Sequence, residues 1–372
     1  MFHHVLRQGD NLQLTGIRIQ SRYRAASHNH ARAFAMIVLA FVGGMFSLAA
    51  EAQSSAPLIL SRTIALPGIG GKFDHLAIDT AGNRLFIAAT GNHSVEMIDL
   101  KTDKVQQSIT GLGKPHGLAW FAATGSLYVA DGSLGELRVY SGSPLALAGK
   151  IKLSTDADDM VGDEANHLLF VGHGTGDAAN PTKVAVVDTR SFALIANLAV
   201  ATHPEALDVD LQSHRVFANI ADSGEVVTID TGTKAITAHW KLTKAADNVP
   251  LAFDAEHNML FVACRTPGTV LGLDATTGKE VTGLPTAGGV DDLFYDPALR
   301  RVYVIAGVGE VDAYQLDDAK NLRALGVLHT AAGAKTALFV AAQNLLYVGI
   351  PGVGEHAAEI RVYATEKNGG AR

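Results

Sequence analysis

Hydrophobic and polar residues alternate along most of the chain in short runs, and a cluster of turn-forming residues follows each run. Val, Ile, Leu and Phe at every second position are typical of β-strands packed between other sheets. In the first such segment the pattern predicts four strands, at 75–79, 84–88, 94–100 and 104–110. Turn clusters containing Gly, Asn, Asp and Thr separate these strands. We therefore expect an all-β protein.

The four-strand pattern recurs along the chain. Its second strand has sequences such as RLFIAA, SLYVAD and LLFVGH, and copies of it begin 42 to 47 residues apart. Repeats of this length with four strands each are typical of β-propellers. We therefore predict a seven-bladed β-propeller with four antiparallel strands per blade. The residues that mark the seven copies are Leu85, Leu127, Leu169, Val216, Leu260, Val302 and Leu346.

The last copy predicts how the ring closes. After residues 359–363 the chain becomes polar, so the seventh copy lacks a fourth strand. The segment LILSRTIAL at 58–66 precedes the first copy and has the pattern of a fourth strand. We expect it to complete the last blade and to close the ring. The alternative is an eight-copy or open array.

The N-terminal residues do not share the repeat. A basic stretch precedes an almost wholly apolar run at 33–50, and the motif Ala50-Glu51-Ala52 follows. This order is typical of a secretory signal, although eighteen apolar residues can also span a bilayer as an uncleaved anchor. We therefore expect a periplasmic or secreted protein with no membrane span in the mature chain. The predicted parts are a signal segment at 1–52, a propeller at 53–366 and a polar tail at 367–372.

Composition narrows the classes of partner. The formal net charge is -7, charged residues make up 18% of the chain, and no basic run stands out. Binding to nucleic acid requires clustered Lys and Arg, so nucleic acid is excluded as the main partner. Cys264 is the only cysteine, which rules out an intramolecular disulfide. We expect a monomer that binds a small molecule or a protein.

Comparison of the copies reveals one column of ionisable residues. It lies eleven residues before each marker, where the innermost strand of each blade is expected to begin at the channel mouth. His75 follows the first member of the column, and the loops between second and third strands add His173 and Arg265. We expect these side chains to gather at one end of the channel. The column reads Asp74, His116, Asp158, Glu205, Val249, Asp291 and Lys335.

Carboxylates close together repel one another unless a cation or a proton lies between them. Oxygen ligands alone suit Ca²⁺, whereas an added imidazole favours Zn²⁺ or another transition metal. Such a metal would activate a bound water, with His116 as general base and Lys335 holding an anionic group. The alternative is that these side chains only fix the packing between blades. The candidate metal ligands are Asp74, His116, Asp158, Glu205 and Asp291.

The strands LYVAD, LFVGH and LYVGI, with VVDTRS, TIDTGTKAI and GLDATTGKEV, resemble the YVTN-type β-propeller repeat family of secreted bacterial proteins. The resemblance covers nearly all of 58–364, and it implies the fold and export but carries no catalytic motif. That family has mostly binding or surface roles, so the leading hypothesis is recognition of a small ligand or protein through the channel mouth. The alternatives are a metal-dependent hydrolase or lyase of the lactonase kind, and a structural module displaying its outer blade edges.

Overall fold

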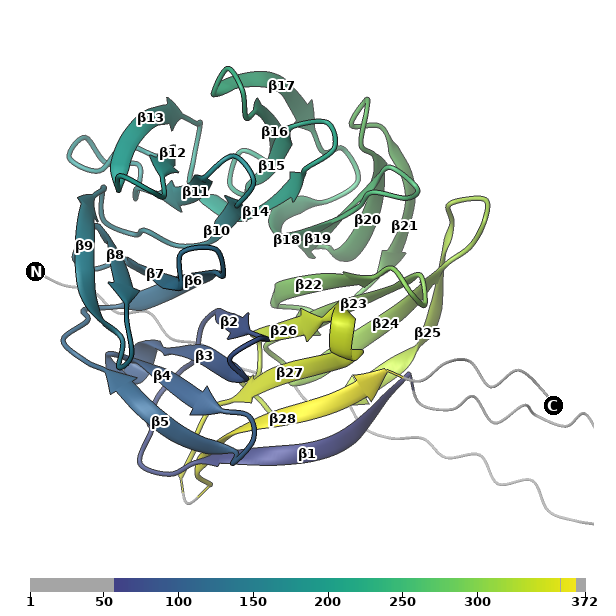
Figure 1. The fold of residues 1–372 in the computed structure, drawn as a ribbon. Coiled ribbons are helices and arrows are strands. Elements are labelled where there is room, and N and C mark those ends of the chain that lie inside the picture. Colours follow the sequence, from purple (N-terminus) through teal and green to yellow (C-terminus); the bar gives the residue numbers. More distant parts are fainter. Residues whose placement is uncertain (1–56, 355, 366–372) are drawn as a thin grey trace, which may run out of the picture. The chain divides into compact units, whose positions relative to one another are not determined.

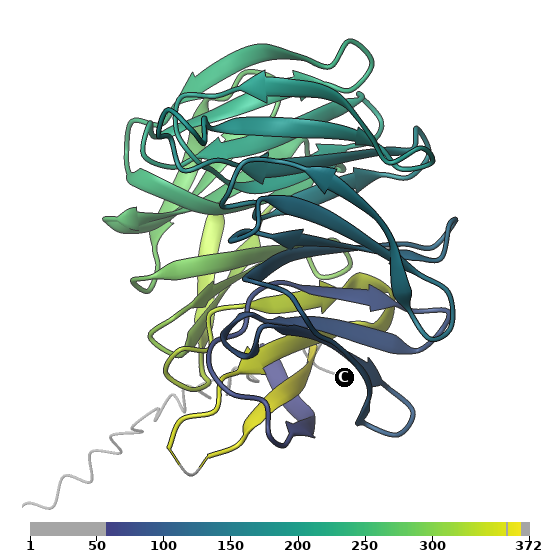
Figure 2. The same cartoon turned by 90° about the vertical axis from the view of Figure 1, so that its left-hand side faces the viewer.

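The computed structural model describes residues 57–354 and 356–365. The predicted signal segment, 1–52, and the predicted tail, 367–372, lie outside the described residues. The described part belongs to one compact unit and consists of seven four-stranded antiparallel sheets around a central channel (Figure 1). Seen from the side, the strands run from one face of the ring to the other (Figure 2). The prediction of a seven-bladed β-propeller is confirmed.

The strands lie where the repeat places them. In blade one, β2 (Leu76–Asp79), β3 (Arg84–Ala89), β4 (Ser94–Asp99) and β5 (Lys104–Ile109) differ from the predicted ranges by at most one residue at either end. The strands of blades two to four are β6 (Pro115–Phe121), β7 (Ser126–Asp131), β8 (Glu136–Ser141), β9 (Ala146–Lys152), β10 (Met160–Asp163), β11 (Leu168–His173), β12 (Lys183–Asp188), β13 (Ala193–Ala199), β14 (Pro204–Asp210), β15 (Arg215–Ile220), β16 (Glu225–Asp230) and β17 (Ala235–Lys241).

Blades five to seven continue the order. Their strands are β18 (Ala246–Asp254), β19 (Met259–Thr266), β20 (Gly268–Asp274), β21 (Glu280–Pro285), β22 (Val290–Asp296), β23 (Arg301–Ala306), β24 (Glu310–Leu316), β25 (Leu322–His329), β26 (Ala337–Val340), β27 (Leu345–Ile350) and β28 (Ala358–Thr365). Two single turns of 3₁₀-helix, η1 (Thr90–Asn92) and η2 (Ala341–Gln343), connect consecutive strands of the first and last blades. No helix among the described residues has the length and hydropathy that a membrane crossing requires.

The ring closes as the sequence predicts. Strand β1 (Leu58–Leu66) pairs antiparallel with β28, and the sheet order is β1-β28-β27-β26. Ile64 and Leu66 are fully buried and pack with Phe73 and Ile360. The first strand of the described chain is therefore the outermost strand of the last blade (Figure 1).

The core lies between neighbouring blades. The second strand of each blade is buried on both faces, as in β3 and β11, whereas outer strands such as β13 alternate between exposed and half-buried positions. Aspartates at the end of the first strands accept backbone N–H groups of the following turn, as Asp79 does from Gly82 at 2.9 Å. This role is the turn-capping one that such a sequence position favours.

The innermost strands of blades one to six begin with an irregularity that positions the site. In blade one the N–H of Asp74 donates to the carbonyl of Ala88 at 2.9 Å, and the N–H of Ala88 donates to the carbonyl of His75 at 3.0 Å. Asp74 and His75 thus both lie opposite Ala88, and two residues opposite one form a β-bulge. Blade three repeats these bonds with Asp158 and the next residue opposite Gly172. Register shifts occur at the equivalent place in blades two, four, five and six. Because a bulge re-aims side chains, the ionisable column projects into the channel.

Candidate binding site at the channel mouth

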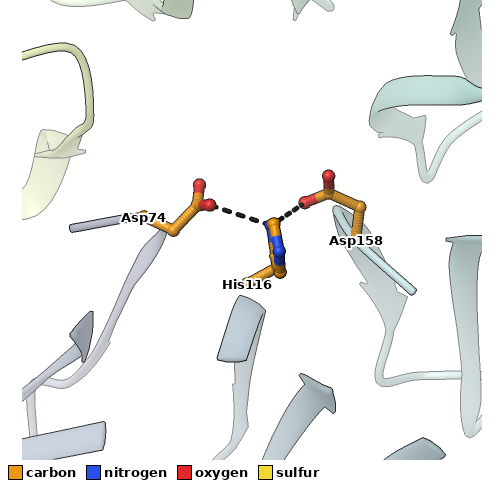
Figure 3. A group of neighbouring side chains, drawn as sticks. All are labelled: Asp74, His116 and Asp158. Atoms are coloured by element: carbon orange, nitrogen blue, oxygen red, sulfur yellow. Dashed lines mark ion pairs between the residues drawn. The ribbon is translucent and has the colours of Figure 1, made fainter. Parts of the chain in front are cut away.

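Three residues of the column meet at the mouth and form what we call the Asp–His–Asp cluster: Asp74, His116 and Asp158. Nδ1 of His116 lies 2.9 Å from Oδ2 of Asp74 and 3.2 Å from Oδ1 of Asp158. In Figure 3 the imidazole stands between the two carboxylates. The side chains are only 6%, 7% and 18% exposed for His116, Asp74 and Asp158. Residues from three consecutive blades thus share one buried charged contact.

Blade two approaches blade three closely at this point because residue 117 is glycine. A Cβ on Gly117 would lie 2.2 Å from the carbonyl oxygen of Asp158, a distance that no side chain tolerates. This explains why glycine occupies a position where blades one, three and six carry His75, Asp159 and Asp292. The missing side chain lets the imidazole of His116 reach both of its neighbours.

His75 is a buried cation in the channel. Its Nε2 lies 3.7 Å from Asp74 and 3.8 Å from Asp158, and its Nδ1 lies 3.9 Å from both Asp159 and Asp292. Burial alone would lower the pKa of His75, but these four carboxylates raise it to about 10. The imidazole is therefore charged at neutral pH and reduces the repulsion among the acids.

The Asp–His–Asp cluster has the electrostatics of an ion pair. Burial opposes the charged form of His116, yet Asp158 and Asp74 raise its pKa to about 9. Burial likewise opposes ionisation of Asp158, but His116 and His203 hold the pKa of that carboxyl well below its usual range. His203 Nε2 lies 3.8 Å from Oδ2 of Asp158. In the ligand-free protein His116 is thus an imidazolium, which cannot act as a general base in that form.

The opposite part of the mouth contains the predicted cations. Arg265 donates to Oδ1 of Asp291 at 2.8 Å, and Nζ of Lys335 pairs with Oδ2 of the same carboxylate. Both cations are therefore paired with the same aspartate, which balances only one of their two charges. Glu205 is half-buried, and burial raises its pKa. Its electrostatic neighbours include His203 and Arg265, so it belongs to the same mouth.

Below the mouth the channel contains a cavity of about 370 Å³, which we call the channel cavity. Four carboxylates and His75 line it, together with apolar side chains such as Leu251, Leu293 and Phe339. The lining carboxylates belong to Asp159, Asp208, Asp291 and Asp292.

Three of these carboxylates also join neighbouring blades. Asp159 accepts the N–H of Leu207 at 2.8 Å, and Asp292 accepts the N–H of Ala337 at 2.7 Å. Asp208 accepts the N–H of Phe253 at 2.7 Å. Each bond satisfies a backbone donor on the inner edge of the next blade, which has no strand to pair with. The packing role that we set against ligand binding is thus real for these three aspartates.

Burial shifts the acids of the channel cavity toward their protonated forms. It raises the pKa of Asp208 to about 6 and that of Asp292 to about 8. For Asp292 the charge of His75 acts in the opposite direction, but does not outweigh burial. The side chains that line the channel cavity thus include four aspartates and one histidine, His75.

The structure separates the predicted residues into two groups. Asp74, His75, His116 and Asp158 are in mutual contact, and Asp291, Arg265 and Lys335 form the second contact. His173 joins neither, because its Nδ1 accepts the N–H of Ser154 at 3.1 Å and its Nε2 bonds to Asn197 at 2.9 Å. Burial lowers the pKa of His173, as expected for a neutral imidazole of the core.

Four channel residues were not among the predicted site residues: Asp159, His203, Asp208 and Asp292. Asp159 and Asp292 directly follow members of the column, and His203 precedes Glu205 by two residues. The bulge brings adjacent residues to the same side, so the position after each column residue was the available signal. Asp208 lies further along β14, and only the curvature of the inner strand brings it to the channel cavity.

Fold and site define a seven-bladed β-propeller with a channel lined by acids and imidazoles. No protein-family model matches the chain, and no curated protein sequence matches it. Solved structures with the same fold include the Mitotic Checkpoint Complex, with a TM-score of 0.69 and 13% identity over 94% of this chain and 100% of that chain. U3-55K gives a TM-score of 0.68 and 12% identity over 84% and 99% of the two chains. Hydrazine synthase of Kuenenia stuttgartiensis gives a TM-score of 0.66 and 15% identity over 76% of this chain and 95% of that chain. At these identities the likeness shows the fold alone.

Proposed function

We propose that this protein is an exported recognition module that binds a small, positively charged organic molecule through the channel mouth. One observation carries the proposal: four aspartates and several apolar side chains line a single cavity of about 370 Å³. Small-molecule sites in proteins combine apolar walls with a few convergent polar groups in this way. Export, and membership of the YVTN-type family that the repeats resemble, are parts of the same proposal.

The charges of the channel cavity favour a cation. Arg265 and Lys335 both pair with Asp291, and His75 is the cation facing Asp159 and Asp292. Asp208 has no cationic partner among the described contacts, and its two oxygens accept the N–H groups of Val209 and Phe253. A half-buried carboxylate without a counterion is costly, so an ammonium group in the cavity would be stabilised there. The apolar wall would contact the hydrocarbon part of the ligand.

The test compares three probes of one shape: benzylammonium, benzyl alcohol and benzoate, titrated calorimetrically into the purified protein. We expect benzylammonium to bind with the highest affinity, and Asp208→Asn to weaken its binding about tenfold or more, since one lost ion pair of ~1.4 kcal/mol corresponds to that factor. Asp318→Asn is the matched control, because Asp318 pairs with Arg300 on the surface. Equal binding of the alcohol, preferential binding of benzoate, or no binding of the ammonium probe would each contradict the proposal.

The second candidate function is a metal-dependent hydrolase or lyase of the lactonase kind. The observation that favours it is the contact of His116 with two carboxylates, a donor set suited to a metal that activates water. This function predicts metal-dependent opening of a simple γ-lactone, followed as acid release at constant pH. A rate equal to that of buffer with the same metal would eliminate it.

A further inference from the structure

The Asp–His–Asp cluster has a property that a plain ion pair does not explain. Both carboxylates lie within 3.2 Å of Nδ1 of His116, yet neither nitrogen of the ring has a hydrogen-bond partner. The side chain is 6% exposed, so water does not satisfy these atoms from outside. Buried polar atoms of native proteins nearly always have a partner, and an exception requires an explanation.

The orientation of the imidazole relative to the two carboxylates explains why no hydrogen bond forms. An imidazole N–H donates in the plane of the ring, whereas the two carboxylates flank Nδ1 on either side (Figure 3). The two carboxylate oxygens lie 2.9 and 3.2 Å from Nδ1, and all three atoms lie close together. Neighbouring ligand atoms that share one metal ion at 2.0–2.2 Å are separated by ~3.3 Å, close to these distances.

A second histidine stands next to the cluster. Nδ1 of His203 donates to the carbonyl oxygen of Gly174 at 2.9 Å, and its Nε2 lies 3.8 Å from Asp158. Burial opposes the charged form of His203, yet Asp158 and the carbonyl of Gly174 raise its pKa to about 9. His203 thus faces Asp158 and helps to keep that carboxyl ionised.

The backbone holds the cluster in place. The N–H groups of Asp74 and Asp158 donate to Ala88 and Gly172, each at 2.9 Å, which fixes both bulges. Gly132 lies against the imidazole of His116, since a Cβ there would be 3.1 Å from its Cδ2. The donor atoms are thus preorganised on strands of three different blades, which favours binding without rearrangement.

From this geometry we infer that Asp74, His116 and Asp158 bind one divalent transition-metal ion, with His203 beside the site as a partner of Asp158. Two carboxylates and one imidazole form a mixed oxygen and nitrogen set that suits Zn²⁺, whereas Ca²⁺ prefers oxygen alone. The metal replaces the proton on Nδ1 of His116, which is released on binding. This site lies outside the channel cavity, and it is independent of the proposed binding of an organic cation.

The proposed metal site contains three of the five candidate metal ligands from the sequence. Asp291 is excluded because Arg265 and Lys335 already occupy its two oxygens. Glu205 lies at the same mouth but outside the group of atoms that approach within 4.8 Å of one another. Asp318→Asn provides the control, because Asp318 pairs with Arg300 on the surface and its replacement removes a carboxylate without touching the mouth.

The experiment measures zinc in the intact protein after removal of metals with a chelator and dialysis against Zn²⁺. We expect one zinc per chain. We also expect His116→Gln and Asp158→Asn to reduce the affinity by at least about tenfold, since even outer-shell partners contribute 10–100-fold, whereas Asp318→Asn leaves it unchanged. No zinc in the wild type, or equal losses in Asp318→Asn and His116→Gln, would overturn the inference.

A spectrum of the wild type keeps the inference testable if a variant fails to fold. Co²⁺ added to the metal-free protein should give the intense visible absorption of a four-coordinate site, and one equivalent of Zn²⁺ should abolish it. A spectrum that matches aqueous Co²⁺ would overturn the site. Because both readouts use metal alone, they are separate from the test with ammonium probes.

Discussion

At the scale of single residues, the channel shows how burial and charge act on the same side chains. His75 is held in its charged form by four surrounding carboxylates, whereas Asp208 is half-buried with backbone donors only. Cys264 illustrates the simplest case, because the thiol is fully buried in the core and burial raises its pKa to about 12. This thiol is therefore a packing residue, as its apolar sequence context indicates.

Asp208 makes a testable contribution to stability. Burial raises its pKa in the folded protein to about 6, whereas the unfolded chain has a value near 3.9. Between these two pH values the native state binds more protons, so this group lowers the free energy of unfolding as pH rises. In Asp208→Asn this loss is absent. The stability of the variant relative to wild type should therefore increase between pH 4 and pH 7, by about 3 kcal/mol at most.

Urea unfolding at several pH values from 4 to 7 measures this difference. The amide oxygen of Asn still accepts the N–H of Phe253, so the bond between the blades is retained. Asp318→Asn is the control, because Asp318 is exposed and Arg300 lowers its pKa. Its replacement should therefore not raise the free energy of unfolding relative to wild type as pH increases. Parallel pH profiles for Asp208→Asn and wild type would show that the pKa of Asp208 is not raised.

At the scale of elements, two devices build the site and the ring. The β-bulge at the start of the innermost strands of blades one to six places two successive side chains on the channel side. In blade five, where the column has Val249, Asn219 of the neighbouring blade donates to the carbonyls of Val249 and Pro250 at 3.0 and 3.1 Å. The apolar bulge of this blade thus receives its polar partner from the neighbouring blade, and the bulge itself adds no charge to the mouth.

Strand β1 provides the prediction at this scale. A chain that begins at residue 67 lacks the strand and loses the burial of Leu58, Ile64 and Leu66, each worth about 1.5–3 kcal/mol. We expect its midpoint of thermal unfolding to lie on the order of 10 °C below that of a chain beginning at residue 53. Circular dichroism of both chains measures the difference. Equal midpoints would mean that β1 does not stabilise the ring.

At the scale of the whole molecule, residues that are far apart in the sequence meet only because the ring is closed. His75 and Asp292 are 3.9 Å apart, although four blades separate them along the chain. The contact between the first and the last blades depends on β1, so the mouth and the ring closure are coupled. A loss of β1 should therefore weaken ligand binding at the mouth as well as stability.

Export is the prediction that concerns the complete chain. We expect expression of the full sequence in a Gram-negative host to deliver the protein to the periplasm, with a new N-terminus at Gln53 after the Ala50-Glu51-Ala52 motif. Cell fractionation and N-terminal sequencing measure both. Replacement of Ala50 and Ala52 by bulky residues should block cleavage. Protein that stays in the cytoplasm with residues 1–52 attached would contradict the prediction.

The fold and much of the mouth could be predicted because both depend on local pattern. Alternation with period two fixes which side chains are buried in a strand, and the spacing of the copies fixes how many blades form. The column Asp74, His116, Asp158 was visible because the repeat places equivalent residues at one end of every blade. His203 and Asp208 were not visible, since their approach depends on local curvature rather than on register.

The sequence alone determined the seven four-stranded repeats and the turn-capping aspartates, because each depends on residues close together in the chain. It also determined the closing strand, because the last copy lacks one strand and residues 58–66 have the pattern of the missing one. Only the tertiary structure decided which ionisable side chains touch. In the structure two carboxylates of the column contact His116, and Asp291 of the column contacts Lys335 and Arg265. His173 lies in the core and contacts neither group. The reason is physical: contacts across a closed channel depend on bulges and on the tilt of each blade, at distances of a few ångströms that no repeat pattern specifies.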